Sequence, residues 1–228
     1  MTGQEDRPAP VTPVALGAAP VALGVAGVAR ALVARTPVTG SLRLVTLGPT
    51  GTSADDAARS LAHAVAEEGG QVGVELHDDF DGARRSVHDG VDGHVTAALV
   101  PSAFAGATRF HWDPALALLG VVVRPTPTYG LAVRSPEAAG RPVVVVASLP
   151  EVRGLVDDLA PPALRRARRI DRPAPSTVAA ARDVAGGLAD VAVCNEPGRR
   201  RHGLTWIAHR EGVPMPWSVF VTVGVAGR

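Results

Sequence analysis

Two hydroxyl-bearing loops stand out as places where this chain could hold a small anion. In the run GPTGTS at residues 48–53, Thr52 and Ser53 follow an apolar stretch and precede an alanine-rich helical pattern. Ser176 and Thr177 precede a second such pattern. The first backbone N–H groups of a helix lack an intrahelical partner, and the helix dipole favours negative charge there. Both pairs are therefore candidate anion anchors, although such residues also serve as plain N-caps.

The composition excludes several kinds of chemistry. All 23 basic residues are arginine, so a lysine Schiff base and a lysine-bound pyridoxal phosphate are impossible. Cys194 is the single cysteine, which rules out an intramolecular disulfide and a zinc site with several cysteines. The seven histidines match no standard zinc spacing, so we expect no metal and no cofactor. A net charge of +1 and 4% aromatic residues predict neither nucleic acid nor a membrane as partner.

From residue 42 the hydrophobic pattern alternates between strands and helices. Short apolar runs predict strands at residues 42–47, 72–76, 95–100, 116–123, 129–133, 143–147, 167–170, 191–194, 204–208 and 218–223. Helical periodicity predicts helices at residues 54–68, 80–89, 150–159, 176–186 and 196–202. This alternation is typical of parallel sheets covered by helices, and so of an α/β protein.

Prolines indicate how the chain divides into lobes. The run RPTP at residues 124–127 looks like a crossing between lobes, because proline stiffens the chain and ends strand pairing. We therefore expect one lobe from residues 41–125 plus 204–228, and a second lobe from residues 126–203. If the two hydroxyl-bearing loops belong to different lobes, both helix starts face one cleft, which suits a small dicarboxylate.

Residues 1–40 are predicted to be an N-terminal extension that is either flexible or partly helical, and a membrane role is a further alternative. Their apolar segment contains Pro20, Arg30 and three glycines, which argues against a membrane-spanning helix. The first residues, MTGQEDRPAP, lack the basic start of a secretory signal, so we expect a cytoplasmic protein. The chain ends soon after the last predicted strand, which predicts no regulatory ACT-type extension, and a homodimer is left open.

Two motifs resemble those of a known family. GPTGTS at residues 48–53 resembles the GPxGTxS loop of prephenate dehydratase catalytic domains, with Ala54 in the position of that loop's final serine. The run STVAAA at residues 176–181 resembles the (S/T)TAxAA stretch of the same family. The resemblance covers about residues 42–224. It implies a two-lobed α/β fold like that of type 2 periplasmic binding proteins, with the substrate cleft between the lobes.

Two departures from the dehydratase pattern argue against ordinary dehydration. Residues 101–105 read PSAFA where dehydratases have a PIENS-like run. Dehydratases also carry a Thr-Arg-Phe motif with a catalytic threonine, and the matching residues here are Ser218-Val219-Phe220. Valine thus replaces an arginine expected to hold a substrate anion. Ser218 takes the place of the catalytic threonine, and the resemblance makes it and the adjacent Trp217 candidate catalytic residues.

Three longer stretches resemble a smaller branch of this family, the prephenate decarboxylases of the bacilysin (anticapsin) pathway. They are TPTYGLAVR at residues 126–134, Asn195-Glu196 followed by HGLT at residues 202–205, and VPMPWSVF at residues 213–220. This resemblance implies loss of CO2 from prephenate without a cofactor, giving a non-aromatic dihydro-4-hydroxyphenylpyruvate for antibiotic and other secondary metabolism. A prephenate dehydratase and a catalytically silent small-molecule binding module are the alternatives.

The remaining candidate residues surround the predicted crossing and one strand end. Tyr129, the only tyrosine, could hydrogen-bond the substrate or donate a proton. Arg124 and Arg134 flank the crossing and could each give a carboxylate a charge-assisted hydrogen bond. Asn195 lies where a predicted strand meets a predicted helix, a common edge of a site. Cys194 beside it is expected to be a buried core thiol.

Overall fold

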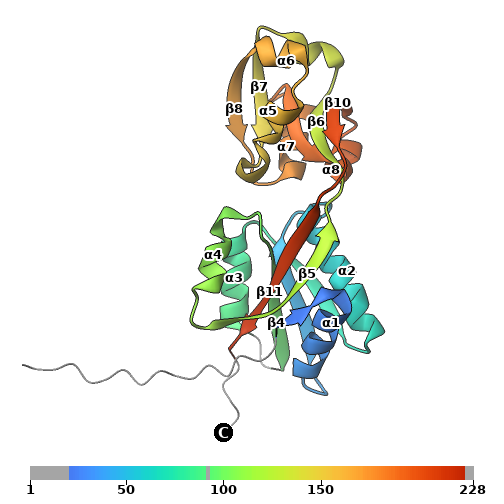
Figure 1. Ribbon diagram of the computed structural model, residues 1–228, viewed down its shortest axis with the longest axis vertical. Helices are drawn as coiled ribbons and strands as arrows, with labels where there is room; N and C mark the ends of the chain where they lie inside the picture. Colours follow the sequence, from blue (N-terminus) through green and yellow to red (C-terminus); the bar gives the residue numbers. More distant parts are fainter. Residues whose placement is uncertain (1–20, 91–92, 224–228) are drawn as a thin grey trace, which may run out of the picture.

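The computed structural model describes residues 21–90 and 93–223, which form two lobes joined by two chain crossings (Figure 1). Each lobe is built around its own sheet, and helices pack on both sheets. This arrangement confirms the predicted α/β class.

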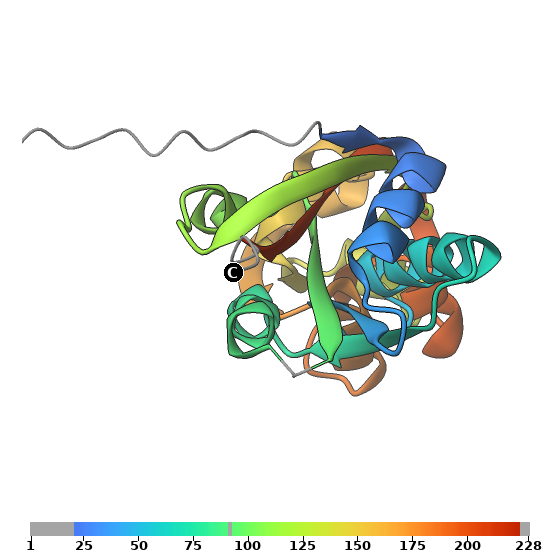
Figure 2. The same cartoon turned by 90° about the horizontal axis from the view of Figure 1, so that it is seen from below.

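The first lobe has a mixed sheet with helices on both faces. Its elements are β1 (Ala22–Leu23), α1 (Gly24–Arg35), β2 (Ser41–Leu47), α2 (Ser53–Glu67), β3 (Val72–His77), α3 (Phe80–Asp89), β4 (His94–Pro101), α4 (Thr108–His111), β5 (Leu116–Pro125) and β11 (Pro214–Thr222). The strand order is β1-β5-β11-β4-β2-β3. Figure 2 shows α1 and α2 on one side of this sheet and α3 and α4 on the other. Helix α2 packs here because it buries an apolar stripe at helical spacing, Ala54, Ala57, Ala58, Leu61 and Val65.

The second lobe follows the same plan with shorter helices. Its elements are β6 (Tyr129–Val133), β7 (Val143–Ser148), α5 (Leu155–Leu159), α6 (Pro162–Arg166), β8 (Arg168–Pro173), α7 (Thr177–Ala185), β9 (Val191–Asn195), α8 (Glu196–Arg201) and β10 (Thr205–Arg210). The strand order is β10-β6-β9-β7-β8. The prediction of parallel sheets is wrong, because both sheets are mixed. Strands β6 and β11 come directly after the two crossings and run antiparallel to their neighbours.

The N-terminal region is helical in part, which is one of the two predicted alternatives, but its described residues are not a separate extension. Helix α1 buries Val28, Ala29 and Leu32 completely in the core of the first lobe, and β1 pairs with β5. This apolar face makes α1 part of the lobe. Residues 1–20, the rest of the predicted extension, lie outside the described residues. Among residues 21–90 and 93–223, no helix combines the length and the apolar character needed to cross a membrane.

The boundary between the lobes also differs from the prediction. Strand β10 pairs with β6 in the second sheet, so only the part of residues 204–228 that follows Arg210 returns to the first lobe. Strand β11 then begins at Pro214 and not at residue 218. Its prolines are tolerated because β4 ends opposite Trp217, which leaves the start of β11 paired with β5 alone.

The two crossings are bonded to each other. The Thr126 N–H donates to the carbonyl oxygen of Val213 at 2.9 Å, and the Val213 N–H donates to the Thr126 hydroxyl at 3.2 Å. Gly212 allows this approach, because a Cβ atom there would lie 1.6 Å from the Thr126 carbonyl oxygen. The predicted crossing near the RPTP prolines is thus half of a two-stranded hinge.

A buried asparagine connects the lobes beside this hinge. The Asn195 amide donates to the carbonyl oxygen of Gly51 in the first lobe at 2.9 Å, and its oxygen accepts from the Gly198 N–H at 3.0 Å. Asn195 therefore caps α8 and also holds the glycine loop that precedes α2. Arg201 makes a second bond of this kind, to the Thr50 carbonyl oxygen at 3.2 Å.

Truncation of a core leucine should destabilise the second lobe strongly. Leu131 of β6 is fully buried, so we expect Leu131→Ala to lower the free energy of unfolding by about 2–5 kcal/mol through lost burial and a cavity. Leu188 is 59% exposed in the same lobe, and Leu188→Ala should change it by less than about 0.5 kcal/mol. Chemical denaturation followed by circular dichroism measures both, and equal losses would contradict this core assignment.

The two roles of Asn195 can be separated by two substitutions. Asn195→Ser keeps an N-cap acceptor but loses the donor to Gly51, so we expect a loss of about 1 kcal/mol in the free energy of unfolding. Asn195→Ala loses both bonds, and the loss should rise by about a further 1 kcal/mol. Denaturant unfolding of the three proteins tests this, and indistinguishable variants would argue against a separate role for the bond between the lobes.

Candidate active site

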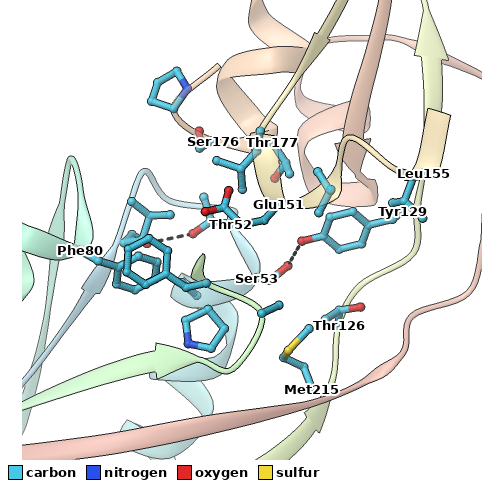
Figure 3. A pocket seen from close by; sticks show the side chains of 18 of the residues that line it. Thr52, Ser53, Phe80, Thr126, Tyr129, Glu151, Leu155, Ser176, Thr177 and Met215 are labelled. Carbon is cyan, nitrogen blue, oxygen red and sulfur yellow. Dashed lines mark hydrogen bonds between the residues drawn. The ribbon is translucent and has the colours of Figure 1, made fainter. Parts of the chain in front are cut away.

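A cleft of about 680 Å³ lies between the lobes and is lined by residues of both. The first lobe contributes Thr52, Ser53 and Phe80, and the second contributes Tyr129 and Thr177 (Figure 3). Clefts of this size between lobes are usual sites for small molecules. The structure thus brings the two hydroxyl-bearing loops to one cavity, as the sequence predicts.

The loop before α2 places one hydroxyl in a cap and leaves the next at the cleft. Thr52, not Ser53, is the N-cap: its hydroxyl accepts from the Asp55 N–H at 3.1 Å and donates to the Leu47 carbonyl oxygen at 3.1 Å. Asp55 also accepts from the Gly51 N–H at 2.9 Å. Because Asp55 and Asp56 lie in the first turn of α2, they offset much of its positive end.

The loop before α7 repeats this arrangement without the acids. The Ser176 hydroxyl caps the helix by accepting from the Ala179 N–H at 3.1 Å, and Thr177 is the first helical residue. No acidic residue lies in the first turn of this helix of nine residues. Of the two helix starts, that of α7 therefore offers a carboxylate the more favourable electrostatic environment.

Tyr129 lies between the two helix starts. Its hydroxyl is 2.5 Å from the Ser53 hydroxyl of the other lobe (Figure 3). Burial raises the pKa of Tyr129 above its usual value, although hydrogen bonds from Ser53 and Thr177 act in the opposite direction. The phenol therefore keeps its proton at neutral pH and can donate it or a hydrogen bond to a molecule in the cleft.

Much of the remaining cleft wall is apolar. In the first lobe, Phe80 and Phe104 pack together with their ring centroids 4.4 Å apart. Trp217 and Met215 of β11 line the cleft from the first lobe, and Leu155 lines it from the second. Figure 3 shows Met215 and Leu155. Such a surface suits a cyclic hydrocarbon ring and keeps water away from it. Trp217 thus lines the cleft, and its catalytic role stays a prediction.

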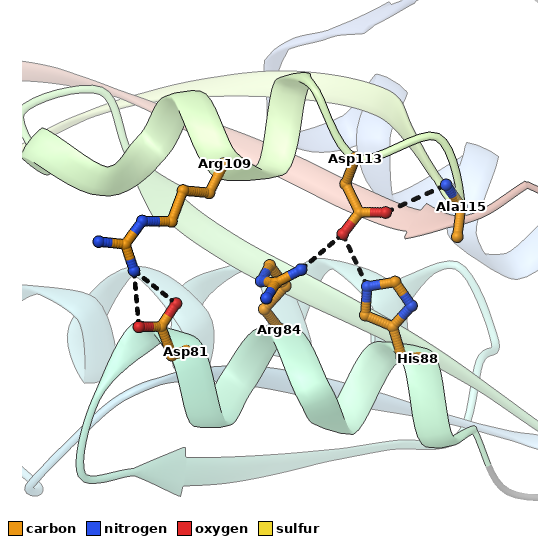
Figure 4. Close-up of polar contacts among 6 residues, drawn as sticks. All are labelled: Asp81, Arg84, His88, Arg109, Asp113 and Ala115. Carbon is orange, nitrogen blue, oxygen red and sulfur yellow. Dashed lines mark hydrogen bonds and ion pairs between the residues drawn. The ribbon is translucent and has the colours of Figure 1, made fainter.

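Ion pairs fix the part of this wall that α3 and α4 form (Figure 4). The Asp113 carboxylate accepts from Arg84 and His88, each at 2.7 Å, and from the Ala115 N–H at 3.1 Å. Burial acts to raise the pKa of Asp113, but the bonds from His88, Ala115 and Arg84 outweigh this and hold it below its usual range. His88 is therefore bound to Asp113 and helps to hold α3 against the loop that follows α4.

Two arginines line the cleft, Arg109 and Arg210, and neither is among the site residues predicted from the sequence. Arg109 is bound to both carboxylate oxygens of Asp81 at 2.7 and 3.0 Å (Figure 4). Arg210, at the end of β10, forms no ion pair with any described residue. The cleft is also lined by acidic residues, namely Asp78, Asp79, Asp81, Glu151, Asp158 and Glu211.

Several predicted site residues lie elsewhere. Arg124 of β5 donates to Ser60 and lies 3.6 Å from the Asp56 carboxylate, both of which belong to α2. It does not line the cleft. Arg134 is exposed just after β6, at the end of that strand away from Tyr129. Ser218 does not line the cleft, because side chains alternate along a strand and its neighbour Trp217 does. These substrate and catalytic roles stay predictions to which the geometry gives no support.

Two further predictions concern the buried residues Asn195 and Cys194. Asn195 also does not line the cleft and holds the loop behind it. Cys194 is fully buried, as predicted, and burial raises its pKa to about 12, so it stays a thiol. Within residues 21–90 and 93–223, no three histidine, cysteine or acidic side chains gather as metal ligands would.

Solved structures share the two-lobed fold. A prephenate dehydratase from Arthrobacter aurescens in complex with L-Phe matches with a TM-score of 0.54 and 18% identity, over 82% of this chain and 62% of that chain. The periplasmic binding protein BugD matches with a TM-score of 0.58 and 17% identity, over 82% of this chain and 78% of that chain. These likenesses confirm the predicted periplasmic-binding-protein-like fold and say nothing of activity.

Sequence relatives are more specific. A Bacillus subtilis (strain 168) protein named prephenate decarboxylase is 33% identical over 180 residues, which cover 77% of this chain and 84% of the relative. A Planktothrix agardhii (strain NIVA-CYA 126/8) protein of the same name is 31% identical over 192 residues, which cover 84% of this chain and 94% of the relative. No family model matches the chain. At this identity and coverage, the chain belongs to the prephenate decarboxylase family.

Proposed function

We propose that this protein removes CO2 from prephenate without aromatising the ring, in secondary-metabolite (antibiotic) amino-acid biosynthesis in the cytoplasm. The observation that carries the proposal is the cleft itself, where two helix starts and Tyr129 meet an apolar wall. The sequence relatives named prephenate decarboxylase support the same substrate.

The reaction needs no external electron acceptor. As the bond between the ring and its carboxylate breaks, the electron pair passes into the ring diene and a proton adds to a terminal carbon of that system. The products are CO2 and dihydro-4-hydroxyphenylpyruvate, which keeps the ring hydroxyl. An enzyme that does not protonate this hydroxyl prevents its loss and so prevents aromatisation. The absence of lysine is compatible with this route, because the substrate supplies the electron sink.

The two carboxylates of prephenate need different environments. We assign the pyruvyl carboxylate to the start of α7, because Thr177 lines the cleft there and the first turn of the helix contains no acidic residue. The ring carboxylate then lies toward Ser53 and the apolar wall. There a weakly solvated carboxylate is less stable, which favours its conversion to neutral CO2.

Tyr129 is our candidate proton donor. It is close to both helix starts and holds its proton at neutral pH. The carbanion formed by loss of CO2 is far more basic than a phenolate, so transfer is downhill. The Ser53 and Thr177 hydroxyls can then donate to the phenolate oxygen until it is reprotonated.

Incubation with prephenate tests the function directly. We expect release of one CO2 per prephenate and a non-aromatic product that retains the hydroxyl, measured by CO2 trapping, ultraviolet spectra and mass spectrometry. Phenylpyruvate would identify a dehydratase, and unchanged prephenate would identify a binding module. Either outcome would overturn the proposal.

Removal of the Tyr129 hydroxyl tests its assigned role. We expect Tyr129→Phe to lower kcat about a hundredfold or more, the usual contribution of a general acid, while the protein stays folded and loses only about 1 kcal/mol of stability with the bond to Ser53. Because burial raises the pKa of Tyr129 above 10.0, the proton-bearing form persists as pH rises, and the wild-type kcat should not fall from this cause between about pH 7 and 9. A variant with full kcat would exclude Tyr129 as the donor.

A further inference from the structure

Strand β10 contains a bulge just before it reaches the cleft. Its pairing with β6 starts regularly, with Thr205 opposite Val133 and Trp206 opposite Ala132. The next pair is Ala208 with Leu131, so Ile207 has no partner of its own. A single extra residue of this kind is a β-bulge, and it reverses which side chains face each side of the strand from there on.

The bulge decides which residue lies beside Tyr129. With regular pairing, His209 would be opposite Tyr129, whereas the observed partner is Arg210. Directly opposed residues of an antiparallel pair project from the same face of the sheet with neighbouring Cβ atoms. Tyr129 points into the cleft (Figure 3). Its ladder partner Arg210 projects from the same face and also lines the cleft.

The other face of β10 belongs to helix α8. The His209 ring stacks on Trp206, with centroids 6.0 Å apart, and the Trp206 indole N–H donates to Glu196 of α8 at 3.0 Å. His209 is not among the residues that line the cleft, which agrees with the reversal at the bulge.

Glycine at position 130 makes the bulge possible. A Cβ atom on Gly130 would lie 2.3 Å from the Ala208 carbonyl oxygen and 2.7 Å from the His209 Cβ. Any side chain at this position would push β10 away from β6 just after the unpaired Ile207. Gly130 and the bulge thus together place the Arg210 side chain on the cleft face of β10.

Arg210 brings an available positive charge to that position. Its side chain is exposed and forms no ion pair with a described residue, whereas Arg109 across the cleft is bound to Asp81. Glu211 also lines the cleft but does not pair with it. On β11, Val219 is fully buried in the first core and offers no charge. The cation available for a substrate anion therefore comes from β10.

We propose that Arg210 binds one carboxylate of the substrate and is a residue on which recognition of the dianion depends. This inference rests on the proposed function for the identity of the ligand, prephenate. A guanidinium presents two parallel N–H donors to a carboxylate, which gives orientation as well as attraction. The pair with Tyr129 in the ladder sets the anchored carboxylate next to the candidate proton donor.

Steady-state kinetics of three variants test the proposal. We expect Arg210→Gln to raise the KM for prephenate about tenfold to a hundredfold, with a smaller change in kcat. Arg210→Lys, which keeps the charge without the fork, should recover part of this loss. Arg168→Gln removes an exposed arginine of β8, outside the cleft, and should leave KM within twofold. All variants should keep the thermal unfolding midpoint of the wild type.

A double variant tests the role of the bulge. In His209→Arg/Arg210→Gln the charge moves by one residue to the α8 face, so we expect no recovery of KM. The KM of the wild type should also rise with salt more steeply than that of Arg210→Gln, because only the wild type has the ion pair. Full recovery in the double variant, or a KM within twofold of wild type in Arg210→Gln, would overturn the inference.

Calorimetry with prephenate separates this inference from the proposed function. If the wild type releases CO2 and Arg210→Gln binds prephenate equally well, only the role of Arg210 fails. If the wild type binds prephenate without CO2 release and Arg210→Gln loses binding, only the decarboxylase activity fails. A wild type that neither binds nor converts prephenate overturns both.

Discussion

The cleft between the lobes depends on the close contact between the two chain crossings. Thr126 and Val213 bond to each other across the crossings, and Gly212 is required because any side chain would collide with the Thr126 carbonyl. Two bonded strands restrict how the lobes can move and favour hinge bending over twisting. This constraint explains how residues as distant in sequence as Ser53 and Thr177 can meet one tyrosine.

The charge distribution of the cleft suits a substrate that must lose a carboxylate. Asp55 and Asp56 offset the positive end of α2, and Asp81 pairs with Arg109. In contrast, the first turn of α7 contains no acid, and Arg210 lines the cleft without an ion pair to a described residue. In our proposal, the side with α7 and Arg210 therefore holds an anion and the side with α2 disfavours it. Such a difference within one site follows from ordinary capping and pairing, and it needs no unusual residue.

The sequence predicted elements and loops well where the local signal was strong. Helix α3 and strand β6 have the predicted bounds because their periodicity and flanking turn residues agree. The hydroxyl-bearing loops were found because their serine and threonine residues cap the helices that follow them.

The direction in which a side chain points was harder to predict. Arg124 and Arg134 were chosen for their place in the sequence, yet neither lines the cleft. Arg210 was missed because a one-residue bulge leaves no signature in composition.

The short N-terminal strand and α1 have a consequence for how molecules of this protein behave toward one another. Without them β5 would form an open border of the first sheet, with unpaired backbone groups available to another chain. Gly120 lets Ala22 approach so closely that an added Cβ would lie 2.5 Å from the Ala22 carbonyl oxygen, and Val28 covers the same position. Strand β1 pairs with Gly120 and Val121, so residues 22–35 interrupt this edge at its middle. A truncated protein that lacks them would expose the whole of β5 to edge-to-edge pairing with its neighbours.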